Sequence, residues 1–206
     1  MSKEFLRQGK LIVIEGCDGA GGETQVKLLK EKMPACLFFQ YPDYNNEIGK
    51  MIHRFLHREL EVDTNTQFLL YATDMVKDTP KVKSALDEGR DVIMDRYFFS
   101  TMVYQGLQGF PLEKALKFAE MFGLVKPDLV ILLKIRAETS IKRKKMEKKE
   151  NIDRWEGNVE WQKMVAERYE EMAKNNVFAK RWVVIDGERT IEEVNKEILR
   201  AIKSLK

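Results

Sequence analysis

A glycine-rich segment near the N-terminus has the residue types that bind phosphate. It reads Gly16-Cys-Asp-Gly-Ala-Gly-Gly-Glu23 and lies between an apolar run and a stretch with helical periodicity. Glycines allow backbone turns that direct successive N–H groups at phosphate oxygens, and the start of a helix adds a favourable field. The segment therefore predicts a phosphate-binding loop, with a glycine-rich turn that binds nothing as the alternative.

This segment departs from the usual pattern G-x-x-x-x-G-K-[ST] at its last two positions. Gly22 stands where a lysine would reach the β- and γ-phosphates, and Glu23 stands where a hydroxyl would hold Mg²⁺. Carboxylate oxygens also bind Mg²⁺, so Glu23 is a candidate metal ligand. The pattern thus predicts a loop that binds phosphate without the lysine and the hydroxyl that usually act on the phosphate charge and on Mg²⁺.

Two further groups of charged residues suit phosphate chemistry. Asp95-Arg96 follows the apolar run 90–94, and a basic run contains Lys142, Arg143, Lys144, Lys145, Lys148 and Lys149. Phosphoryl transfer needs two phosphates held in line and their developing charge neutralised by cations and amides. The alternatives are a surface ion pair for Asp95-Arg96 and a solvated charged helix for the basic run.

Short apolar runs predict the sheet that positions these residues. Strands are expected at residues 10–15, 35–41, 90–94, 128–133 and 182–185. Helical spacing is found around 24–33, 48–56, 66–76, 82–88, 112–122, 138–172 and 191–205. Alternating strands and helices predict an α/β fold with a doubly wound, five-stranded parallel sheet flanked by helices, in which ligands bind beyond the carboxyl ends of the strands.

The composition limits the classes of function. The 206 residues, 44% of them apolar, suit one domain over 1–206. The net charge of +3 comes from 36 basic and 33 acidic residues, a balance that argues against nucleic-acid binding. Cys17 and Cys36 fit no metal-ligand spacing, and no apolar run reaches the ~20 residues of a membrane span. We expect a cytoplasmic protein without a membrane partner.

Six motifs, in order along almost the whole chain, resemble the thymidylate kinase family. They are 11–25 (LIVIEGCDGAGGETQ), Tyr41-Pro42-Asp43 with Glu47-Ile48-Gly49-Lys50, Leu69-Leu70-Tyr71-Ala72, Asp95-Arg96-Tyr97 with Ser100, Tyr104, Gln105 and Gly106, Lys126-Pro127-Asp128-Leu129, and Asp153-Arg154-Trp155-Glu156. The resemblance implies a P-loop NTPase fold with a helical lid at about 138–158. It also implies transfer of phosphate from ATP, with Mg²⁺, to dTMP, and a homodimer formed through the helices at 68–75 and 112–122.

The resemblance also implies a role for individual residues. ATP would contact Gly16, Cys17, Asp18, Gly19, Ala20, Gly21, Gly22, Glu23, Thr24 and Arg143. The monophosphate dTMP would contact Asp18, Tyr41, Tyr71, Arg96, Ser100 and Tyr104. The catalytic residues would be Asp95, Arg96, Arg143 and Arg154, and the metal ligands Asp95 and Glu23. In the family, Asp18 binds the deoxyribose 3′-hydroxyl, Tyr71 stacks on thymine and Tyr104 crowds the ribose 2′-position, whereas core aromatics are the alternative for both tyrosines.

Members of the family with Gly after the loop aspartate place catalytic basic residues in the lid. Gly19 and the basic run of this chain agree with that pattern. Tyr44 and Met75, however, stand where many members have arginines that contact the monophosphate and thymine. Three hypotheses follow: a dTMP kinase, a kinase of another nucleoside monophosphate, or a nucleotide-binding relative that has lost catalysis.

Overall fold

The computed structural model describes residues 8–147, 153–155 and 157–205 and contains one five-stranded sheet in that part of the chain. The strands are β1 (Leu11–Gly16), β2 (Leu37–Gln40), β3 (Val92–Asp95), β4 (Leu129–Lys134) and β5 (Trp182–Asp186). Their order is β2-β3-β1-β4-β5, and every neighbouring pair is parallel. The predicted parallel sheet of five strands is confirmed.

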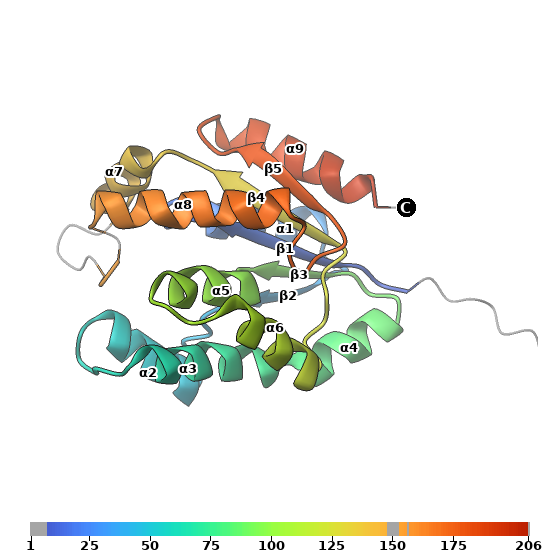
Figure 1. Cartoon of the computed structure of the whole chain (residues 1–206). Helices are drawn as coiled ribbons and strands as arrows, with labels where there is room; N and C mark the ends of the chain where they lie inside the picture. Colours follow the sequence, from blue (N-terminus) through green and yellow to red (C-terminus); the bar gives the residue numbers. More distant parts are fainter. Residues whose placement is uncertain (1–7, 148–152, 156, 206) are drawn as a thin grey trace, which may run out of the picture.

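Helices cover both faces of the sheet (Figure 1). On one face α1 (Gly22–Lys32) packs with α9 (Ile191–Lys203), and on the other α5 (Phe98–Leu107) packs with α8 (Val159–Lys174). Beyond α5 lie α3 (Thr64–Val76) and then α2 (Glu47–Leu56), while α7 (Ala137–Glu147) packs against α8. The remaining helices are α4 (Thr79–Asp87), which contacts β3, and α6 (Leu112–Met121), which contacts α5.

The central strand β1 explains why the sheet forms where the sequence predicts it. All six of its residues are buried, because helices cover both of its faces. A parallel strand buried on both faces needs a continuous apolar run rather than an alternating one, and Leu11, Ile12, Val13 and Ile14 provide it. Only Glu15 interrupts the run, and its side chain is 2% exposed.

Two helical expectations need correction. Helix α5 was not expected, because most of its residues are buried and it therefore lacks the polar stripe that makes helical periodicity visible. The single helix expected over 138–172 is wrong, since α7 and α8 are separate helices and the described residues between them, 153–155 and 157–158, are not helical. The Asn158 side chain caps the start of α8 by accepting a hydrogen bond from the Trp161 amide.

Parts of the expected lid, residues 148–152 and 156, lie outside the described residues, including Lys148, Lys149 and Glu156. Among the helices that the structure does describe, none has the length and apolar character needed to cross a membrane.

Candidate active site

The glycine-rich segment forms a loop between β1 and α1. Gly19 and Gly21 have φ angles of 73° and 97°, a region that favours glycine, and Gly21 is the N-cap of α1. Gly21, as the N-cap, has no side chain to cap this helix, so the N–H groups of its first turn are available to an anion. Residues 16–24 line a cleft of about 490 Å³, which we call the phosphate cleft. The predicted loop therefore has the shape that phosphate binding requires.

Cys17 lies within this loop but is buried. Its side chain is 4% exposed, and burial together with the nearby Asp18 raises the pKa of the thiol to about 12. The thiol is therefore protonated at neutral pH and is not nucleophilic in this conformation.

Asp95 approaches the loop at Gly22, where the lysine is missing. A Cβ atom at Gly22 would lie 2.7 Å from Asp95 Oδ1. Burial and the charge of Glu23 raise the pKa of Asp95 to about 6, although Arg96 opposes the shift. Asp95 and Glu23 thus line the same cleft with negative charge, an arrangement that a divalent cation would relieve.

Arg96 follows β3 and points into the site. Its φ angle is 62°, its Nη2 lies 2.6 Å from Asp18 Oδ1, and its Nη1 donates to Ser100 Oγ at 3.3 Å. Burial disfavours the guanidinium charge, but Asp18 and Tyr104 hold the pKa of Arg96 well above its usual range. The side chain is therefore a fixed cation paired with the aspartate of the phosphate loop.

A second cavity, of about 100 Å³, adjoins the phosphate cleft and is lined by the residues expected to contact dTMP. We call it the acceptor cavity. Asp18, Tyr41, Tyr71, Arg96, Ser100 and Tyr104 all line it. Tyr104 donates its hydroxyl to Asp18 Oδ2 at 3.1 Å, which joins the aromatic wall to the loop. The structure thus brings together every residue predicted for the acceptor site, and their roles stay predictions.

Several lining residues were assigned no role at the site from the sequence, among them Thr101 and two residues of the motifs, Gln105 and Trp155. Among the described residues, Thr101 Oγ1 and Gln105 Oε1 are buried without a hydrogen-bond partner. A buried polar atom costs free energy unless it is paired, so these atoms suit a ligand with hydrogen-bonding groups. The sequence carried a signal for both, because Gln105 belongs to the resemblance itself and Thr101 directly follows Ser100, another of its residues.

The basic residues expected to act in catalysis point in different directions. Arg143 donates to the backbone carbonyls of Gly19 and Gly187, at 3.1 and 2.9 Å. Arg154 lies over the Phe55 ring and pairs with Glu61. Neither arginine lines the two cavities, whereas Lys144 lines the phosphate cleft. The catalytic roles of Arg143 and Arg154 stay predictions, and among the described residues of the expected lid Lys144 is the cation that lines the cleft.

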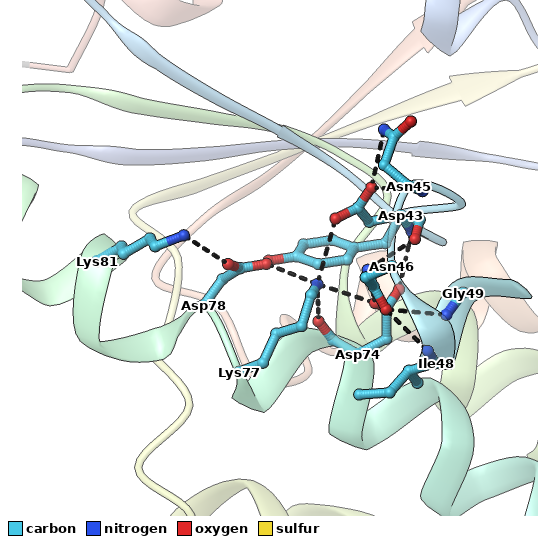
Figure 2. Close-up of polar contacts among 10 residues, drawn as sticks. Asp43, Asn45, Asn46, Ile48, Gly49, Asp74, Lys77, Asp78 and Lys81 are labelled. Carbon is cyan, nitrogen blue, oxygen red and sulfur yellow. Dashed lines mark hydrogen bonds and ion pairs between the residues drawn. The ribbon is translucent and has the colours of Figure 1, made fainter.

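A charged cluster supports the wall of the acceptor cavity (Figure 2). Lys77 Nζ lies 2.9 Å from Asp74, 2.8 Å from Asp78 and 3.7 Å from Asp43. The Tyr41 hydroxyl donates to Asp78 at 3.3 Å. Because Tyr41 lines the cavity and bonds Asp78, Lys77 supports the cavity wall through the carboxylates with which it pairs.

We expect Lys77→Met to lower the free energy of unfolding by about 3–5 kcal/mol, because it leaves a carboxylate that is 1% exposed, Asp74, without its cation. Equilibrium urea unfolding measures the change. Lys81→Met is the matched control: Lys81 is 75% exposed and its nitrogen lies 3.8 Å from Asp78, so about 0.5 kcal/mol or less is expected. Equal losses in the two variants would contradict this account.

The parallel sheet, the glycine-rich loop at the start of α1 and the acid–arginine pair at the end of β3 define a P-loop phosphotransferase. Residues 14–198 match the family model described as thymidylate kinase. The chain therefore belongs to the thymidylate kinase family, a family of nucleoside monophosphate kinases, as the resemblance predicted.

Individual relatives agree with this assignment. A probable thymidylate kinase of Methanocaldococcus jannaschii is 38% identical over 94% of this chain and 96% of the relative. A thymidylate kinase of Danio rerio is 33% identical over 93% of this chain and 89% of the relative. The structure of thymidylate kinase from Candida albicans superposes with a TM-score of 0.75 at 24% identity, over 96% of this chain and 92% of that one. This likeness confirms the predicted P-loop NTPase fold.

Proposed function

We propose that this chain transfers the γ-phosphate of ATP to dTMP, giving ADP and dTDP. The observation that carries the proposal is that Asp18 and Arg96 line both the phosphate cleft and the acceptor cavity. An acceptor phosphate and a donor phosphate bound in these two spaces would meet at Arg96. Two relatives that align over most of the chain, from Methanocaldococcus jannaschii and Danio rerio, are named as a probable thymidylate kinase and a thymidylate kinase.

Different residues bind ATP, bind dTMP and stabilise the transferred phosphoryl group. The loop amides and the start of α1 bind the phosphates of ATP, while Arg143 fixes the loop by binding the Gly19 carbonyl. Tyr71 and Tyr104 hold the nucleoside of dTMP, and Arg96 draws its phosphate towards the cleft. Arg96 would also neutralise charge that develops on the transferred group.

Mg²⁺ fits the proposed reaction, because Asp95 and Glu23 offer two carboxylates at the phosphate cleft. Mg²⁺ usually binds one or two carboxylates together with substrate phosphates. When bound, the ion would neutralise the phosphate oxygens of ATP.

We propose that Lys144, on the proposed lid helix α7, replaces the cation missing at Gly22. Lys144 lines the same cleft as residues 16–24, and Arg143 does not line it. An ammonium group acts on phosphate as a point charge and does not need the fork geometry of arginine.

A coupled ADP-release assay with ATP, Mg²⁺ and dTMP tests the function. We expect turnover that stops when dTMP is omitted, and lower kcat/KM for dUMP, dCMP, dGMP and AMP. Faster turnover of another monophosphate would instead support the second hypothesis, for which Tyr44 and Met75 in the acceptor cavity give a physical reason. Nucleotide binding without turnover would show that catalysis has been lost.

We propose a homodimer through an apolar face on α3 and α6. Leu69 is 52% exposed and Met121 73% exposed, and the two border an apolar hollow of about 310 Å³ with Phe68, Phe110 and Phe118. Exposed apolar patches of this kind mark protein interfaces. The face coincides with the one expected from the sequence.

Leu69→Asp is expected to weaken dimerisation by at least about 100-fold, because it buries a charge in an apolar interface. Light scattering during size-exclusion chromatography measures the mass. Met164→Asp on α8, also at an exposed apolar residue, is the control and should leave the mass unchanged. A monomeric unsubstituted protein, or a dimer that survives Leu69→Asp, would contradict the assignment of this face.

We also propose that the protein works in the cytoplasm. The buried Cys17 thiol in the phosphate loop suits a reducing compartment.

A further inference from the structure

Glu15 is a buried carboxylic acid next to the phosphate loop for which the proposed reaction gives no role. Successive residues of a strand point to opposite faces of the sheet. Ile14 faces Gly22 of α1, and Glu15 faces α5 and α8, where its side chain is 2% exposed. Burial raises the pKa of Glu15 to about 7, although the charge of Arg96 opposes the shift. Burying a carboxyl group costs free energy unless hydrogen bonds compensate it, so the hydrogen bonds of Glu15 indicate what the group does.

Three hydrogen bonds converge on this carboxyl group. Oε1 accepts from the Tyr97 amide at 2.8 Å. Oε2 accepts from the Ser100 hydroxyl and from the Tyr169 hydroxyl, each at 2.8 Å. Glu15 therefore links β1 to the residue after Arg96, to α5 and to α8.

Hydrogen bonds from β1 hold the backbone on both sides of Arg96. The Arg96 amide donates to the Ile14 carbonyl at 2.9 Å, and the next amide, that of Tyr97, donates to Glu15. Two consecutive residues of β1 thus hold the peptide units on both sides of the Arg96 Cα. They hold it at a φ of 62°, a conformation that a residue other than glycine adopts only when its surroundings impose it. Ser100, which donates to Glu15, also accepts from Arg96 Nη1.

We propose that Glu15 is a positioning residue that holds Arg96 in the left-handed conformation and so directs its guanidinium to the site of phosphoryl transfer. This inference rests on the proposed kinase activity. Without the bond to the Tyr97 amide, the backbone at Arg96 can relax to negative φ, which turns the side chain away from Asp18. Misplacement of a transition-state contact lowers kcat more than it raises the KM of ATP.

A double-mutant cycle tests the proposal. We expect Glu15→Gln to lower kcat about 10-fold and Glu15→Leu at least about 100-fold, with the KM of ATP changed less than about 3-fold. Glutamine is isosteric and keeps an acceptor for the Tyr97 amide, so it should retain part of the function. In the Arg96→Ala background, neither substitution should lower kcat further, because the group that Glu15 positions is gone. If the losses in kcat from the Glu15 and Arg96 substitutions multiply in the double variant, the proposal is overturned. The cycle with Glu15→Gln is sufficient for this test even if Glu15→Leu does not fold.

Asp128→Asn is the matched control, since Asp128 binds the Leu11 amide at the opposite end of β1, at 2.9 Å. It should leave kcat within about 2-fold, whatever its effect on stability. A second readout does not depend on turnover: the side-chain NMR resonance of Arg96, assigned by its loss in Arg96→Lys, should shift in Glu15→Gln and not in Asp128→Asn. If dTMP is not turned over, the proposed function fails, and this resonance alone decides the role of Glu15; an unchanged resonance would overturn it.

Discussion

Replacing Arg96 with alanine is expected to lower the kcat of dTMP phosphorylation by at least about 1,000-fold. One donor directed at developing charge contributes about 10²–10³ to kcat, and an arginine at a transferring phosphoryl group about 10³–10⁵. Arg96 lines both cavities, and among the described residues Lys144 is the one other cation that lines the phosphate cleft. Single-turnover measurements with labelled ATP can follow rates this low.

Two controls separate charge from folding. Arg96→Lys keeps a cation but loses the two-pronged contact with Asp18 and Ser100, so an intermediate loss is expected. Arg136→Ala removes an exposed arginine paired with Glu188 and should leave kcat within about 2-fold. Full activity in Arg96→Ala would remove Arg96 from the reaction and would overturn the proposed site.

Lys144→Ala is expected to lower kcat about 100-fold, and adding Gly22→Lys to that variant should restore most of the loss. A lysine at residue 22 returns a cation to the loop, which makes the cation from α7 dispensable. The Cβ of the new residue would lie 2.7 Å from Asp95 Oδ1, so the Asp95 side chain has to rotate. This rotation is the reason to expect incomplete recovery.

Gly22→Ala distinguishes the two effects of the new side chain. It displaces Asp95 without supplying charge, so it should lower kcat in the otherwise unsubstituted protein. Lys142→Ala, at an exposed lysine two residues from Lys144 on α7, should change kcat less than about 3-fold. No recovery in Gly22→Lys/Lys144→Ala, combined with a stable fold, would contradict the exchange of roles between the two positions.

The strands and the phosphate loop were predictable because their physical requirements leave short, local signatures. A strand covered on both faces needs an unbroken apolar run, as in β1, and tight turns need glycine, as at Gly19 and Gly21. The predicted acceptor residues lie together because α3, α5 and the end of β2 meet at one edge of the sheet.

Side-chain direction was not predictable in the same way. Arg143 and Lys144 are neighbours in a basic run, but successive residues on a helix point about 100° apart, so one reaches two carbonyls and the other reaches the cleft. Helix α5 escaped prediction because a buried helix has no polar face. In both cases the deciding information lies in the neighbouring elements and not in the segment itself.

The buried thiol of Cys17 allows opening of the phosphate loop to be followed by chemical labelling. Alkylation by iodoacetamide requires a thiolate that the reagent can reach, and the closed loop offers neither. The rate of Cys17 labelling at increasing reagent concentration therefore measures how often the loop opens, without any introduced probe. ATP bound to the loop amides should slow this labelling, which gives a footprint of nucleotide occupancy that is independent of turnover.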